Sequence, residues 1–148
     1  MRLCNYPAYQ RLELLEYLTE KARTTDEAQE ILSVFEDDPD PIVRHEAAAQ
    51  LIRLERENPN VVSPLKVKIR EALIRGPQDK SVVIRHEALE SLAYIGDEST
   101  LEILQASIGD ANPDVSNTAK LAYEVLAFRL KHNLKPSELS KAFLSSSA

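Results

Sequence analysis

Hydrophobic residues recur along most of the chain at spacings of three and four, which is the period of one face of an α-helix. The stripe formed by Leu14, Leu15 and Leu18 is a typical case. Proline, aspartate, threonine or serine stands before most stripes, and these residues favour the first turn of a helix. The pattern predicts seven helices, beginning near residues 9, 26, 41, 65, 82, 98 and 113, and a short eighth helix at 136–144. We therefore expect an all-α fold.

Two of these helices carry near-copies of one sequence motif, VRHEAAAQL at residues 43–51 and IRHEALESL at residues 84–92. A third helix keeps the same frame, since Val115 and Ala119 match Ile84 and Ala88. Successive copies are 41 and 31 residues apart, and such periods are typical of stacked helix pairs that bury their apolar faces only against neighbours. We expect a single domain, residues 1–148, forming a short right-handed α-solenoid of four helix pairs. The predicted repeats span residues 7–37, 38–76, 77–109 and 110–145.

The three glycines, Gly76, Gly96 and Gly109, each follow the predicted end of a helix. Helices commonly end in a residue with a left-handed backbone conformation, and glycine adopts that conformation at no steric cost. We therefore expect positive φ angles at these glycines.

Composition and charge exclude several classes of protein. The formal net charge of −6 argues against a general nucleic-acid binder, because such affinity comes from Lys and Arg that neutralise phosphates. The single cysteine, Cys4, cannot form an intrachain disulfide, which favours a reducing compartment. No apolar run approaches the ~20 residues of a membrane span, and the first residues lack the apolar core of a signal peptide. We expect a cytoplasmic protein without a membrane or nucleic-acid partner.

The repeated motif places a His-Glu pair on each of two helices, His45-Glu46 and His86-Glu87. Adjacent residues of a helix point about 100° apart, so one pair cannot close on an ion from a single turn. Two stacked helices could bring both pairs together. Two imidazoles and two carboxylates suit a first-row transition metal such as iron, manganese or zinc.

The pattern D-x-x-VR-x-x-A-x-x-L around residues 43 and 84 resembles HEAT-like repeats, particularly the short subtype found in phycobilisome lyases. The longer motif Arg-His-Glu-Ala (RHEA), present twice, resembles the repeats of deoxyhypusine hydroxylase, a HEAT-repeat family with a dinuclear iron centre. This similarity spans about residues 36–130. In that family, His-Glu pairs on the first helices of consecutive repeats ligate the metals. The resemblance therefore implies iron ligands at His45, Glu46, His86 and Glu87.

The chain departs from that family in the number of His-Glu pairs. The enzyme uses four pairs from two facing halves, whereas this chain has two, and its third copy has Asn117 and Thr118 at the matching frame. A symmetric homodimer would rebuild the full set. A structural role for the pairs also stays open, with His capping a neighbouring carbonyl and Glu pairing with Arg. Arg44 and Arg85 are expected to bridge to acidic turn residues such as Asp38, Asp40 or Asp79.

The polar positions of the repeated helices predict a second kind of site, a shared face that binds a protein partner. Short solenoids present such a surface, and the side chains that line it set specificity. The chain has no phosphate-binding loop, no G-x-S-x-G and no H-E-x-x-H. We expect a protein-binding scaffold without firm cofactors, with the iron protein as the alternative; handling of a phycobilisome chromophore rests on the repeat subtype alone. The candidate partner-binding residues are His45, Glu46, Gln50, His86, Glu87, Glu90, Asn117 and Lys120.

Overall fold

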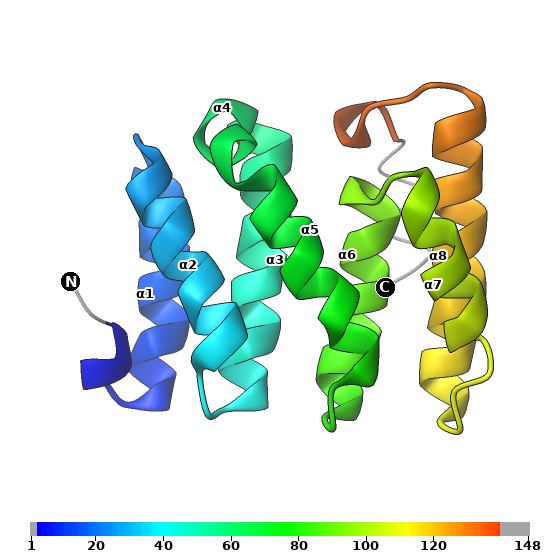
Figure 1. The fold of residues 1–148 in the computed structure, drawn as a ribbon. Coiled ribbons are helices and arrows are strands. Elements are labelled where there is room, and N and C mark those ends of the chain that lie inside the picture. Colours follow the sequence, from blue (N-terminus) through cyan, green and yellow to red (C-terminus); the bar gives the residue numbers. More distant parts are fainter. Residues whose placement is uncertain (1–2, 140–148) are drawn as a thin grey trace. The chain divides into compact units, whose positions relative to one another are not determined.

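The computed structural model describes residues 3–139, and this part of the chain consists of helices joined by short turns, without a β-strand (Figure 1). The α-helices are α1 (Ala8–Lys21), α2 (Thr25–Asp37), α3 (Pro41–Glu57), α4 (Pro59–Val62), α5 (Lys66–Arg75), α6 (Val82–Ile95), α7 (Leu101–Ser107) and α8 (Pro113–Lys131). Five 3₁₀ turns lie between them or beside them, η1 (Leu3–Asn5), η2 (Ser63–Leu65), η3 (Gly76–Gln78), η4 (Glu98–Thr100) and η5 (Pro136–Glu138). The predicted all-α class is confirmed.

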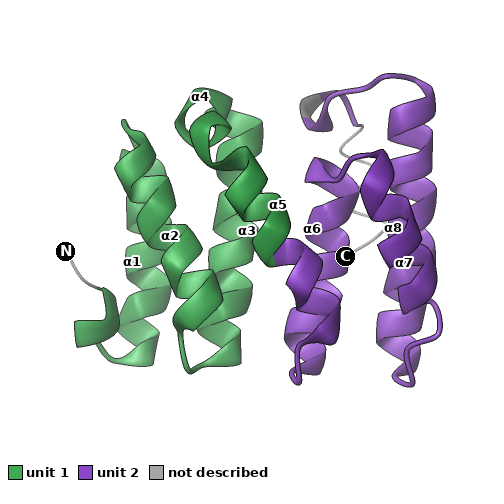
Figure 2. Ribbon diagram, viewed as in Figure 1, with its two compact units in different colours: residues 1–72 green, residues 73–148 purple. Residues whose placement is uncertain are grey.

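The chain divides into two compact units, residues 1–72 and 73–148, and each has its own core (Figure 2). The repeat boundaries and the single domain expected from the sequence stay predictions. Among residues 3–139, no helix has the length and apolar composition needed to cross a membrane.

Most helices begin where side-chain caps predict. Asp40 Oδ1 accepts hydrogen bonds from the backbone N–H groups of Ile42 (2.8 Å) and Val43 (3.4 Å) at the start of α3. Thr24 caps α2, and its hydroxyl donates to Glu27 Oε2 at 2.6 Å, which lowers the pKa of Glu27. These caps satisfy N–H groups that have no partner inside the helix.

In unit 1, α3 packs against both α1 and α2. The predicted stripe of α3 is buried, and the side chains of α2 that face it are at most 2 % exposed at Ile31, Leu32 and Phe35. On α1, Leu15 is fully buried, whereas Leu14 and Leu18 are half-buried. Burial of these side chains is the main force that holds the unit together.

In unit 2, α6 and α7 both pack against α8, and η3 packs against α6. The predicted stripes of α6 and α8 form the core, with Ile84, Ala88, Leu92, Val115 and Ala119 all fully buried. The small Ala residues allow the axes of neighbouring helices to come close. The shared frame of these helices therefore marks the same inward face, as the sequence predicts.

The prediction of positive φ angles at the three glycines is wrong, because no glycine in residues 3–139 has a positive φ. A Cβ atom at Gly76 would clash with the Ala88 side chain, and one at Gly96 would clash with the Leu92 carbonyl oxygen and Thr100 Oγ1. These two glycines are needed for close approach of the backbone to a neighbouring helix or turn. The left-handed residue is Asn133 (φ 52°), just after α8.

Two predicted helices differ in extent. The fourth helix was expected to start at residue 65, but helical structure already begins at Pro59, with α4 and η2 leading into α5. Of the expected eighth helix, residues 136–138 form the 3₁₀ turn η5, and residues 140–144 lie outside the described part of the chain. Prolines at 59 and 64 allow short helical turns but interrupt one continuous helix.

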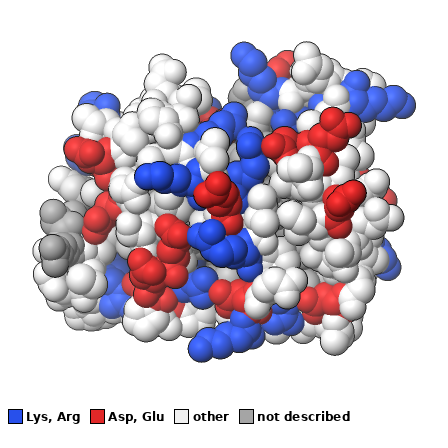
Figure 3. Space-filling model, viewed as in Figure 1, with Lys and Arg blue, Asp and Glu red and all other residues white. Residues whose placement is uncertain are grey.

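The surface mixes charges of both signs, and Figure 3 shows Lys and Arg interspersed with Asp and Glu on one face. In unit 1, Lys66 Nζ lies 3.5 Å from Glu55 Oε1, and Arg53 Nε lies 3.0 Å from Glu57 Oε2. These exposed or half-exposed pairs each contribute little stability. They do show that basic side chains of this unit are neutralised by neighbouring carboxylates.

Candidate functional site

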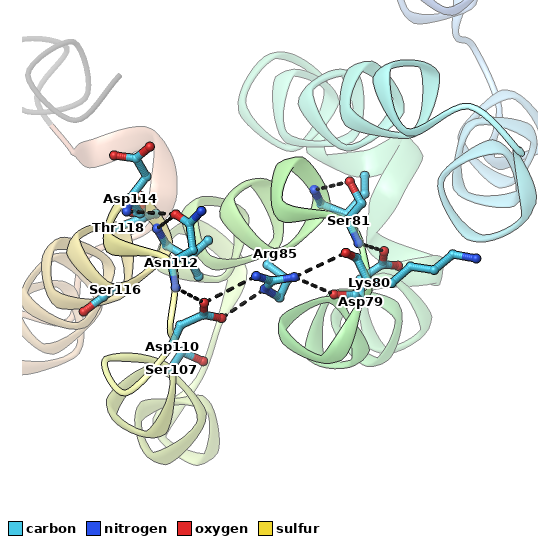
Figure 4. A network of polar contacts seen from close by, with 12 residues as sticks. Asp79, Lys80, Ser81, Arg85, Ser107, Asp110, Asn112, Asp114, Ser116 and Thr118 are labelled. Carbon is cyan, nitrogen blue, oxygen red and sulfur yellow. Dashed lines mark hydrogen bonds and ion pairs between the residues drawn. The ribbon is translucent and has the colours of Figure 1, made fainter.

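Arg85 joins two turns of unit 2, the turn before α6 and the turn before α8 (Figure 4). Its Nε donates to Asp110 Oδ2 at 3.0 Å, and its Nη1 donates to the carbonyl oxygens of Asp79 (3.1 Å) and Lys80 (3.4 Å). The backbone N–H of Asn112 donates to Asp110 Oδ1 at 2.9 Å. That hydrogen bond and the Arg85 guanidinium lower the pKa of Asp110. The Arg85 guanidinium thus links the residues just before α6 to the turn before α8.

Unit 1 has an equivalent arrangement around Arg11. Its Nε and Nη2 donate to the two oxygens of Asp38 at 2.8 and 2.9 Å, and Asp38 Oδ1 also accepts from the Asp40 N–H at 2.9 Å. Arg44 Nε donates to the Phe35 carbonyl at 2.7 Å. The bridging role predicted for Arg85 is confirmed, with the Asp110 carboxylate and the Asp79 carbonyl oxygen as its partners.

The His-Glu pair of unit 2 is tied to the neighbouring helix. His86 Nδ1 lies 2.7 Å from Thr118 Oγ1 on α8, while the Thr118 hydroxyl donates to the Asp114 carbonyl at 2.8 Å. His86 Nε2 lies 3.5 Å from Glu90 Oε2, one turn further along α6. The imidazole is therefore held in one orientation.

In unit 1, Gln50 Nε2 donates to Glu46 Oε1 at 2.8 Å. Gln50 is 6 % exposed and its Oε1 atom is buried without a hydrogen-bond partner. Ser91 occupies the matching position 41 residues later on α6, and its Oγ atom is likewise buried without a partner. The two helices with an RHEA motif, α3 and α6, therefore each carry a buried polar atom without a partner one turn after the Glu of that motif.

The predicted partner-binding residues differ in accessibility. Gln50 and Glu87 are each 6 % exposed, so they present little surface to a partner. Asn117 and Lys120 are exposed on α8, and the remaining four are half-buried; these are His45, Glu46, His86 and Glu90. In unit 2, His86 contacts both Thr118 and Glu90.

Sequence reasoning missed Thr118 and Ser91 as members of this region. Thr118 stands where the other two copies have a Glu, so it does not match the RHEA motif. Its position in the repeat frame was the available signal, since the frame places it on the side of α8 that meets α6. Ser91 had no comparable signal, because its burial depends on the neighbouring helices.

The residues of a single unit do not form a metal site. Within residues 3–139, no group of three or more His, Cys, Asp or Glu side chains could hold a metal ion. Unit 2 offers His86 with Glu90, while Glu87 is buried among its own contacts. Two ligands fall short of the four that structural sites use or the three protein ligands typical of catalytic zinc.

Comparison with known proteins places the chain in a family. The model for HEAT repeats matches residues 28–124. Deoxyhypusine hydroxylase of Cryptococcus neoformans var. neoformans serotype D (strain B-3501A) is 29 % identical over 140 residues, covering 94 % of this chain and 36 % of that protein. Deoxyhypusine hydroxylase of Candida albicans (strain SC5314 / ATCC MYA-2876) is 29 % identical over 111 residues, covering 75 % of this chain and 32 % of that protein.

The chain thus spans about a third of the length of these two curated relatives. No solved structure matches it. The HEAT model covers more than half of the chain, and the paired helices, caps and shared inward frame agree with it. The chain therefore belongs to the HEAT repeat family.

Proposed function

We propose that this HEAT repeat chain is a binding module that holds a protein partner on the polar side chains of its repeated helices. The observation that carries the proposal is the contact between His86 and Thr118, which fixes polar groups of α6 and α8 beside each other. Half-buried His86 and Glu90 and exposed Asn117 form the accessible part of this surface in unit 2. Side chains held in one geometry lose little entropy when a partner binds, which favours affinity.

The HEAT architecture supports the same proposal. Solenoid repeats position rows of side chains on rigid helices, and specificity then depends on the residues at equivalent positions. In this chain the first two copies carry the same pair, His45-Glu46 and His86-Glu87, and the third copy carries Asn117 and Thr118 in the same frame. The third copy would therefore offer a partner different groups from the first two.

Site-specific photocrosslinking tests this function. A benzophenone side chain replaces Asn117 on α8 in one variant and exposed Glu102 on α7 in a matched control. We expect one defined protein to be captured from the Asn117 position, and Glu90→Gln to weaken its binding about tenfold, the size of a lost charge-assisted contact. Equal capture from both positions, or unchanged affinity in the Glu90 variant, contradicts the proposal.

As a second function, we propose an iron protein like the deoxyhypusine hydroxylases, with ligands at His45, Glu46, His86 and Glu87. Two relatives with that name and the two RHEA motifs support it. The contact of His86 Nδ1 with Thr118 Oγ1 is a further support, because metal-bound histidines usually hold their other ring nitrogen in a hydrogen bond. One chain has two His-Glu pairs, and a homodimer would supply four.

Iron content and mass in solution decide between the two functions. The second function predicts near-stoichiometric iron in a dimer, with iron lost in His86→Ala and in His45→Ala. His132→Ala is the matched control, since His132 lies exposed at the end of α8 and its ring contacts that of Phe128 at a tilt of 45°, with ring centroids 4.3 Å apart. A metal-free monomer, or iron lost equally from all three variants, rejects the iron protein and leaves the binding module.

A further inference from the structure

The exposed side of α1 combines tyrosines with glutamates. Tyr9 is 65 % exposed and Tyr17 is 52 % exposed, although both are large aromatic side chains. At about 100° per residue they share one arc of the helix with three exposed carboxylates. The residues of this surface, the α1 face, are Tyr9, Glu13, Glu16, Tyr17 and Glu20.

Equivalent Arg–Asp pairs show which residues of α1 correspond to which residues of α6 and α8. Arg11 pairs with Asp38 as Arg85 pairs with Asp110, and each of these aspartates accepts the N–H of the residue two positions later. Arg11 and Arg85 therefore occupy the same register position. Because α6 and α8 share one frame at an offset of 31 residues, the register extends from α1 to α8.

In this register, Glu13, Tyr17 and Glu20 of α1 correspond to residues 118, 122 and 125 of α8. On α8 these positions are packed within unit 2. Thr118 contacts His86 of α6, and Ala122 and Val125 are each only 4 % exposed.

Three positions of the α1 face, Glu13, Tyr17 and Glu20, thus correspond to α8 positions that are packed within unit 2. On α1 the side chains at these three positions are exposed. The geometry suits a helix as the occupant.

The charges of the α1 face define the chemistry of that helix. Three carboxylates favour Lys or Arg, and the tyrosine rings offer apolar contact and cation–π attraction. Lys21 Nζ already lies 6.0 Å from the centroid of the Tyr17 ring, which shows that a cation fits over it. A second copy that used the same face would bring two rows of glutamates together, which is unfavourable.

We propose that the α1 face docks a basic amphipathic helix of a partner protein. The bound helix places Lys or Arg opposite Glu13, Glu16 and Glu20 and apolar side chains against Tyr17. This surface lies in unit 1 and shares no residue with the proposed binding surface of α6 and α8, so the two proposals fail separately.

A fluorescein-labelled helical peptide of about 15 residues, with lysine at every fourth position beside leucine, is the probe. Fluorescence anisotropy with the full chain measures its dissociation constant. We expect Glu13→Gln, Glu16→Gln and Glu20→Gln together to weaken binding about tenfold, the sum of several exposed ion pairs. Tyr9→Ser with Tyr17→Ser, which leaves the charge unchanged, should weaken it about fivefold through lost contact area.

The matched control removes the same three charges elsewhere, in the variant Glu71→Gln, Glu98→Gln and Glu102→Gln, all of which are exposed. This control should bind the peptide as the unaltered chain does. Equal weakening in both triple variants reduces the effect to net charge and overturns the proposal. So does no effect of the tyrosine changes, or a dimer in sedimentation that the α1 variants dissociate.

Discussion

The Asp110 carboxylate makes two contacts: it accepts a hydrogen bond from the Asn112 N–H at the start of α8, and it pairs with Arg85 of α6. Both contacts favour the ionised form, the backbone bond more strongly, and they lower the pKa of this carboxyl. Two other polar atoms, Ser91 Oγ and Gln50 Oε1, are instead buried without hydrogen-bond partners. At the scale of single residues, stability therefore depends on which polar groups are satisfied.

Asp110→Asn should make unfolding less sensitive to acid. A carboxyl whose pKa is lower in the folded state stabilises it above the unfolded pKa of about 3.9, and this contribution is lost as pH falls through the folded pKa. The unaltered chain should therefore lose stability below about pH 4 more steeply than the variant, while the variant is less stable at pH 7. Thermal unfolding followed by circular dichroism from pH 7 to 2.5 measures both. Parallel curves, with Glu124→Gln as the exposed control, contradict this role.

Ser91→Ala should stabilise the protein by about 1 kcal/mol. Ser91 is 2 % exposed and its buried hydroxyl lacks a partner, so its removal ends a desolvation cost, and alanine also has the higher helix propensity. Urea unfolding gives the change in free energy. A loss of stability on this substitution would show that the hydroxyl is satisfied in solution.

At the scale of elements, caps and close contacts define the helices. Asp40, Ser81 and Asn112 each follow an aspartate whose side chain binds their N–H, and each caps the next helix. Such local chemistry made the starts of α3, α6 and α8 predictable from the sequence. The turn from Pro59 to Leu65 was not predictable in the same way, because its two prolines permit several short helical conformations.

Gly76→Ala should lower the free energy of unfolding by about 1–3 kcal/mol, the usual cost of overpacking. The added methyl group would clash with the Ala88 side chain of α6, so η3 would have to move away from that helix. Gly109→Ala is the control, since its Cβ would lie 3.4 Å from the Ala106 carbonyl oxygen and its φ is not positive. Denaturant unfolding of both variants compares them, and equal costs would show that the close approach of η3 and α6 is unimportant.

At the scale of the whole molecule, the chain combines two cores with an acidic surface. Each unit buries its own set of apolar side chains, as expected where repeats contact only their neighbours. The formal charge of −6 keeps such molecules apart at neutral pH. The α1 face contributes three of the carboxylates, so it influences colloidal behaviour as well as the proposed docking.

Solubility should pass through a minimum near the sequence pI of 5.1, where the net charge vanishes and association is favoured. The variant with Glu13, Glu16 and Glu20 changed to Gln should have its minimum at a higher pH. Light scattering across pH 4–8 measures both proteins. Coincident minima would mean that local contacts, and not net charge, control association.

The sequence by itself determined the helical class, most helix starts and the inward faces of α3, α6 and α8, because caps and a period of 3.6 residues are properties of the local chain. Only the tertiary structure decided that Gly76 and Gly96 serve close packing and not a left-handed turn, that Gln50 and Glu87 are buried, and that His86 is held by Thr118. These features depend on distances between helices that are far apart along the chain. Such distances follow from how whole helices pack, and no short stretch of residues encodes them.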